Sequence, residues 1–251
     1  MTKLFQYELR RLLHNKLFFC VLAVSLGYGW LTLTNTIILG VAHTAPFSPW
    51  SFGYFLSQTL PLICVGELLF LSFFTSKEEL QIRSVIRATS MDQRRYAVIR
   101  CGAVLTGTLL LSLCVVVLAT VFYVRLFGWM NFGELLLPAL LTLLPAIIFC
   151  LGTGLLLMNL HPALIYVLIA AVLLLPLPPL PTAISFSLNN FFSQYPLTLG
   201  KLDPAFHIPS WLIASKTVLT LLGLAFAIVA VNMQKTSFSL NHCRNRMNFK
   251  S

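Results

Sequence analysis

The sequence predicts an all-α, polytopic membrane protein with six transmembrane helices, an N-terminal interfacial helix and both termini in the cytoplasm. Of its 251 residues, 58% are hydrophobic and 10% are charged, whereas an average soluble domain carries roughly 25% charged residues. Apolar runs of about 20 residues, the length of a membrane-spanning helix, recur along the chain. Lysine and arginine gather on alternate connections between these runs. These observations exclude a soluble enzyme, a nucleic-acid-binding domain and a disordered chain.

Residues 1–16 are too polar to span a membrane. On a helix with 100° per residue, one face collects the apolar residues Phe5, Leu9, Leu12 and Leu13, and the opposite face is mostly basic. This pattern is typical of a helix that lies in the interface plane, with its apolar face in lipid and its basic face against anionic headgroups. A solvated extension of the first span is the alternative. We expect no cleaved signal peptide, because the following apolar run is long and has no small-residue cleavage site.

Six segments are long or apolar enough to be assigned as spans, and all six are expected to be helices because only an internally hydrogen-bonded backbone is tolerated in lipid. Few charges fall within them. The fifth is short, and the prolines that follow it end the helix. The expected spans are 17–42, 52–75, 97–124, 132–158, 162–176 and 209–233.

The basic residues set the orientation. Fourteen of the 17 lysines and arginines fall on one side of the six spans, and the positive-inside rule places that side, with both termini, in the cytoplasm. The chain is then a multi-pass protein of the cell (inner) membrane, in contact with its lipids. The connection 177–208 lies outside. Because it is apolar between 184 and 192, we expect it to re-enter the membrane or to pack on protein; an ordinary amphipathic outer loop is the alternative.

The cytoplasmic connection 76–96 carries a narrow apolar stripe. Ile82, Val85 and Ile86 stand at i, i+3 and i+4 in an otherwise charged segment, which is the spacing of one helix face. A helix of this kind, outside the membrane and joined to two spans, suits docking into a groove of a cytoplasmic partner. A charged loop that only fixes the topology is the alternative.

Several motifs occur together around these cytoplasmic pieces. The N-terminal helix holds Glu8-Leu9-Arg10-Arg11, and the second span ends in Phe73-Phe74-x-Ser76-Lys77-Glu78-Glu79. Downstream lie Ile86-x-Ala88-Thr89-Ser90-Met91 and Arg94-Arg95-Tyr96. With six spans and a long last outer loop, the chain resembles the permease subunit of ABC-2-type ATP-binding-cassette exporters. The resemblance covers nearly the whole chain in layout and is specific at residue level only around 73–100.

The resemblance implies one membrane domain over 1–251. In it, 1–16 is a connecting helix at the inner surface, 76–96 is the coupling helix that meets a separate cytoplasmic ATPase, and 177–208 forms short re-entrant helices. It also implies that two permease subunits, in a homodimer or a heterodimer, form the export pathway. The residues then expected at or near the ATPase contact are Glu78, Glu79, Ile82, Arg83, Ile86, Arg87 and Met91.

The chain lacks the motifs of an enzyme. No G-x-x-x-x-G-K-[ST] loop is present, so ATP would be bound by the partner, and we expect a transport subunit without a cofactor of its own. The six cysteines form no Cys-x-x-Cys pair, and no two histidines share a helix face within a span, so neither a disulfide framework nor a metal site is expected.

Two other functions remain as alternatives. One is a non-transporting membrane sensor or assembly module. The other is an intramembrane protease, because Glu78-Glu79-Leu80-Gln81-Ile82-Arg83 matches an E-E-x-x-x-R string. Such a protease needs histidines that converge with the carboxylates inside the membrane, and no matching histidine follows within a span.

Glu67 is the one acidic residue deep within an expected span, about 12 Å from its cytoplasmic end at 1.5 Å per residue. A charge at that depth costs several kcal/mol, so the side chain should face protein or a water-filled cavity. We expect Glu67 to line the export pathway or to pair with Arg100, near the inner end of the third span. A protonated Glu67 that is hydrogen-bonded to a serine or threonine is the alternative.

Overall fold

The computed structural model describes the backbone of residues 2–73, 93–174 and 188–248, and the side chains of 2–73, 95–174 and 188–233. All regular structure in these ranges is helical. The seven residues expected at the ATPase contact lie outside the described residues. So do most of the segment 76–96 and the first part of 177–208.

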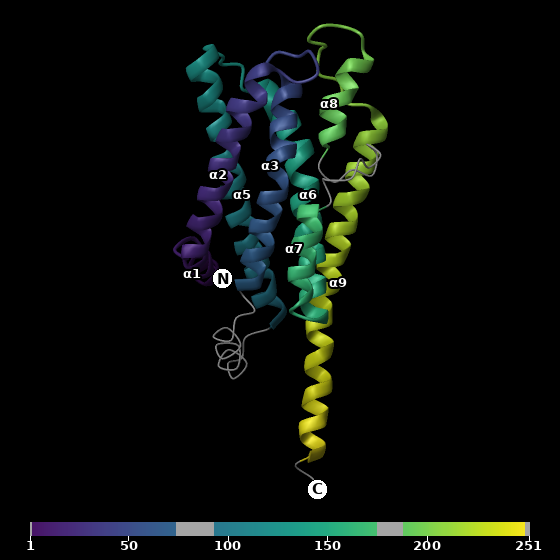
Figure 1. The fold of residues 1–251 in the computed structure, drawn as a ribbon. Helices are drawn as coiled ribbons and strands as arrows, with labels where there is room; N and C mark the ends of the chain where they lie inside the picture. Colours follow the sequence, from purple (N-terminus) through teal and green to yellow (C-terminus); the bar gives the residue numbers. More distant parts are fainter. Residues whose placement is uncertain (1, 74–92, 175–187, 249–251) are drawn as a thin grey trace.

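Within the described residues, five helices are long and apolar enough to cross a membrane (Figure 1). Shorter elements flank them. The five are α2 (Lys16–Asn35, continued by the 3-10 turn η1, Ile37–Leu39), α3 (Pro49–Phe73), α5 (Gln93–Phe127), α6 (Gly133–Leu160) and α9 (Ser210–Asn248). The shorter helices are α1 (Thr2–Leu13), α7 (Leu164–Leu174) and α8 (Asn189–Thr198).

The fifth expected span corresponds to α7, of which the structure describes 11 residues, fewer than a bilayer crossing needs. It packs beside α3 and α6, toward the end of the bundle that is farther from α8 (Figure 1). The count of six spans therefore stays a prediction. Figure 1 also shows that α1 and the far end of α9 lie toward the same end of the bundle. That this end faces the cytoplasm stays a prediction as well.

Two helix ends differ from the expected boundaries. The α-helix of the first span ends at Asn35, not at residue 42, because the chain turns through η1 and adopts positive φ at Gly40, Ala42 and His43. At the other end of the chain, α9 continues from the expected limit at residue 233 as far as Asn248. The start of α2 is close to expectation, with the Asn15 side chain accepting a hydrogen bond from the Leu17 amide at 3.1 Å.

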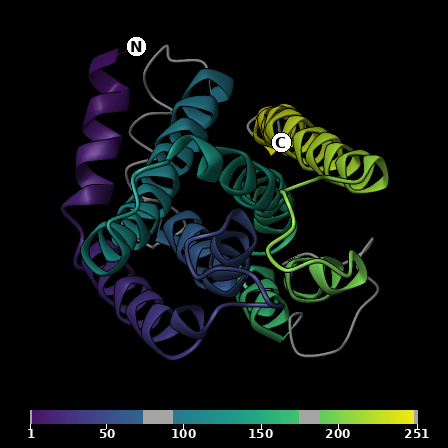
Figure 2. The same cartoon turned by 90° about the horizontal axis from the view of Figure 1, so that it is seen from above.

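The central helix of the bundle is α3. It packs against α2, α5, α6, α7 and α8 (Figure 2), and most of its residues are buried, as expected for a helix that is apolar all round. On one side of it, α6 and α9 approach closely at Gly152 and Gly223. A Cβ atom on Gly152 would overlap the carbonyl of Gly223, so the absence of side chains at both positions permits this contact.

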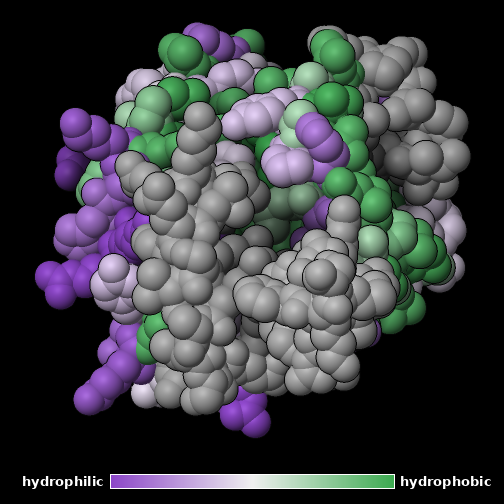
Figure 3. Space-filling view, turned by 90° about the horizontal axis from the view of Figure 1, so that it is seen from below, coloured by the Kyte–Doolittle hydropathy of each residue, from purple (hydrophilic) through white to green (hydrophobic). Residues whose placement is uncertain are grey.

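The N-terminal helix α1, which the sequence predicts to be interfacial, lies across the bundle axis, since it is seen nearly end-on in Figure 1 and lengthwise in Figure 2. Part of its apolar face packs on protein and not on lipid. The Phe5 ring lies over Gly102, Leu12 lies over Gly107, and Leu12 is buried. The small residues of α5 leave room for both side chains. Figure 3 shows hydrophilic side chains gathered along one edge of this end of the molecule.

Candidate functional site

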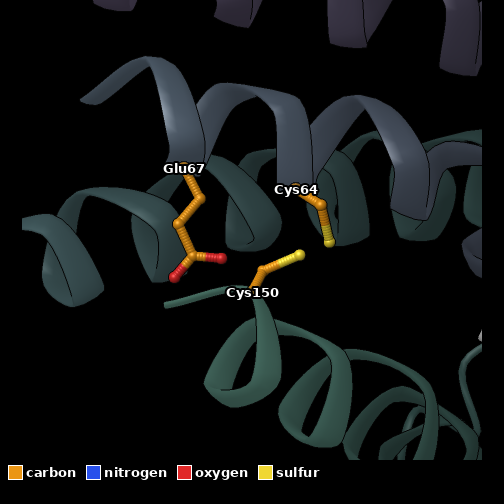
Figure 4. Close-up of side chains that lie close together, drawn as sticks. All are labelled: Cys64, Glu67 and Cys150. Atoms are coloured by element: carbon orange, nitrogen blue, oxygen red, sulfur yellow. The ribbon is translucent and has the colours of Figure 1, made fainter. Parts of the chain in front are cut away.

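The buried acid Glu67 lies between α3 and α6, with two cysteines beside it. Cys64 and Glu67 are three residues apart and share one face of α3, and Cys150 reaches toward them from α6 (Figure 4). The two sulfur atoms and a carboxylate oxygen lie within 4.8 Å of one another. All three side chains have 1% or less of their surface exposed. The arrangement places three potential metal ligands in the interior of the bundle.

The expected pair of Glu67 and Arg100 is not formed. Neither oxygen of Glu67 has a hydrogen-bond partner among the residues that the structure describes, so the alternative, a hydrogen bond to a serine or threonine, is not formed among them either. Arg100 lies one helical turn after Tyr96 on α5, and its guanidinium carbon is 5.3 Å from the centre of the Tyr96 ring. The sequence places Arg100 at the right depth but does not show that its side chain packs on the Tyr96 ring.

A polar contact joins α1 to the start of α5. The Tyr96 hydroxyl donates a hydrogen bond to Oε1 of Glu8 at 3.0 Å, and both residues are buried. On its other side α1 contacts the end of α3, because the guanidinium carbon of Arg11 lies 5.3 Å from the centre of the Phe73 ring. Helix α1 therefore touches Phe73, just before residues 74–92, and Tyr96, just after them.

At the opposite end of the bundle, α8 packs against α3 through an aromatic cluster. Its buried members are Trp50, Leu188, Phe191, Phe192 and Leu212. The Trp50 indole donates a hydrogen bond to the Pro204 carbonyl at 2.8 Å, and Ser57 on α3 is hydrogen-bonded to Asn189. Ser57 lies about 12 Å along α3 from its first residue. The second half of the connection 177–208 thus packs on protein, and its re-entry into lipid stays a prediction.

Sequence reasoning missed both the cysteine neighbours of Glu67 and the partner of Glu8. Cys64 and Glu67 could be recognised as one helix face, but nothing in the sequence indicates that Cys150 lies opposite them. Among the described residues, these three form the one group of histidine, cysteine and acidic side chains that could hold a metal ion.

Comparisons with protein-family models, curated proteins and solved structures gave no match.

Proposed function

We propose that the chain is the membrane-spanning permease subunit of an ATP-driven exporter. It forms the substrate pathway and is driven by separate cytoplasmic ATPase subunits that dock on the segment 76–96. One observation carries the proposal: α1 contacts Phe73, three residues before that segment, and Tyr96, the last residue of the segment. A cytoplasmic partner bound there would act on two helices that α1 already holds together.

The packing of α3 supports a mechanical role for this contact. The helix has 25 residues and is therefore roughly 38 Å long. Its far end packs on α8, and Glu67, six residues before Phe73, faces α6. A displacement at Phe73 would therefore reach both the buried acid and the aromatic cluster through one continuous helix. Packed interfaces of this kind convert small shifts at one end into rearrangements elsewhere.

The sequence motifs indicate which subunit binds the nucleotide. This chain has no phosphate-binding loop, so the nucleotide is bound and hydrolysed by the partner. A second permease subunit, identical or different, completes the pathway. The chain itself does no covalent chemistry: it converts closure of the partner's nucleotide sites into a change of access, by binding one conformation of the partner more tightly than the other.

The test is ATP hydrolysis in vesicles. The purified chain alone should hydrolyse no ATP, and nucleotide-binding subunits from the same cells should hydrolyse it at a rate that changes when the chain is added. We expect Tyr96→Phe to reduce that change, because it loosens α1, and Val98→Ala, an exposed position on the same helix, to leave it intact. ATP hydrolysis by the chain alone would contradict the proposal. So would nucleotide-binding subunits whose hydrolysis rate does not change when the chain is added, and that result would favour the sensor or assembly module.

A further inference from the structure

The group of Cys64, Glu67 and Cys150 has features that packing alone does not explain. A buried acidic side chain is normally hydrogen-bonded, yet both oxygens of Glu67 lack such a partner among the described residues, although the side chain has no exposed surface. The carboxylate points toward the Cys150 sulfur, and the two cysteines point toward each other (Figure 4). The ligand atoms of all three side chains therefore converge on one small region between α3 and α6.

The spacing of these atoms suits a small metal ion. Zinc binds sulfur at about 2.3 Å and carboxylate oxygen at about 2.0–2.2 Å, so ligand atoms around a tetrahedral ion lie about 3.5–4 Å apart. The three atoms here are already within 4.8 Å of one another. A contraction of at most about 1.3 Å, which side-chain rotation can supply, brings them to the spacing of ligands around a tetrahedral ion.

Charge balance favours a divalent ion. Deprotonation of these buried groups without a cation would leave uncompensated negative charge in the bundle, which costs several kcal/mol. All three groups bind a metal ion in their deprotonated form, so a divalent cation offsets two of their three negative charges and leaves the site with a net charge of −1. The ion thus lowers the cost of burying the ionised ligands and gives Glu67 the partner that it otherwise lacks.

The donor set selects the class of metal. Two sulfurs favour soft or borderline ions, whereas Mg²⁺ and Ca²⁺ prefer a shell of oxygen atoms. We propose that Cys64, Glu67 and Cys150 bind one divalent cation of the zinc class and thereby join α3 to α6. With three protein ligands, the fourth position of a tetrahedral ion is left for water or another small ligand. This site goes beyond the proposed transport function and does not depend on it.

The ion would act on the bundle through its two helices. Cys150 is two residues from Gly152, where α6 meets α9, and Cys64 and Glu67 lie on the central helix. A metal bridge at this point would fix the spacing of α3, α6 and α9. Because the three ligands are fully buried, exchange of the ion with solvent should be slow, and the ion should stay bound through purification.

The experiment measures transition metals in the full-length chain, purified in detergent under reducing conditions from zinc-supplemented cells. We expect about one zinc per chain in the wild type and in the controls Cys20→Ser and Cys114→Ser, which alter cysteines outside the group. Cys64→Ser and Cys150→Ser should retain less than about a tenth of the zinc, since a lost ligand weakens binding more than the 10- to 100-fold typical of a lost supporting residue. Glu67→Gln should weaken zinc binding by about tenfold.

A second measurement guards against variants that fail to fold. Wild-type protein from cobalt-supplemented cells should show the near-ultraviolet charge-transfer absorption of sulfur bound to Co²⁺, with no substitution needed. Wild type that contains no more zinc than the two cysteine variants, or cobalt protein without that absorption, would overturn the proposal. Copper in place of zinc would overturn the assignment of the metal.

Discussion

The hydroxyl of Tyr96 donates a 3.0 Å hydrogen bond to Glu8, and this contact attaches the N-terminal helix α1 to the start of α5. The two residues are 88 positions apart in the sequence. The Arg100 guanidinium lies against the same tyrosine ring, so the aromatic side chain stands between a basic residue and an acidic one. The start of α5 is thereby packed against α1.

Removal of this hydrogen bond should loosen α1. Tyr96→Phe deletes the donor and keeps the ring, and removal of one partner of a buried hydrogen bond costs about 1–3 kcal/mol. We expect amide hydrogens of residues 2–13 to exchange about tenfold faster in the variant. Tyr7→Phe is the matched control, because Tyr7 lies on α1 but is 61% exposed. Equal exchange in the two variants would mean that the bond does not hold α1.

The contact between α6 and α9 should tolerate no side chain at Gly152. A Cβ atom there meets the Gly223 backbone, and overpacking of this kind costs about 1–3 kcal/mol. Gly152→Ala should therefore lower the midpoint of thermal unfolding in detergent. Gly27→Ala, in α2, is the control: no atom lies within 4 Å of its Cβ position, so alanine should leave the midpoint unchanged or raise it. Equal effects would argue against a close approach of these helices.

The aromatic cluster should hold α8 on α3. The Phe192 ring is fully buried and occupies the space that a side chain at Gly53 would need. Phe192→Ala should cost about 3–5 kcal/mol and make residues 189–198 more sensitive to protease in detergent. Phe19→Ala removes the same side chain from a position that is 59% exposed and should change neither property. Protease resistance equal to that of the wild type would show that α8 is held by other contacts.

Six spans place the two ends of α7 on opposite sides of the membrane. Lys201 and His161 are both exposed, so cysteines introduced at these positions can report their location. In a chain without Cys20 and Cys243, a membrane-impermeant maleimide should label Lys201→Cys in intact cells, and His161→Cys only after permeabilisation. Labelling of both positions from the same side would mean that α7 does not cross the membrane.

Helix positions follow from the sequence because apolar runs of bilayer length have few other solutions. The limits of α3, α5 and α6 fall within a few residues of the expected spans. The predicted helix ends are wrong where they depend on a local turn or on polar residues. The first span ends early, at a turn with three residues of positive φ. Helix α9 continues into the basic C-terminal segment, because no residue there terminates the helix. The burial of Glu67 follows from the cost of its charge.

Helix rotation does not follow from the sequence. A helix that is apolar all round has no polar face to show which side meets which neighbour. For this reason the sequence could offer Arg100 as a partner for Glu67 although Arg100 faces Tyr96, and it gave no sign that Cys150 faces Cys64. The same limit applies to Glu8, whose partner Tyr96 lies on a helix distant in the sequence.

Co-purification with an ATPase tests the central claim most directly. The tagged chain should bring down a cytoplasmic ATP-binding-cassette subunit from solubilised membranes. The variant Ile82→Asp/Ile86→Asp should lose it, because two acids interrupt the apolar stripe expected to dock. Ser84→Asp/Ala88→Asp adds the same charge to the opposite face of the expected helix and should keep the partner. A folded wild-type chain with no ATPase bound, or equal recovery with both variants, would contradict the account.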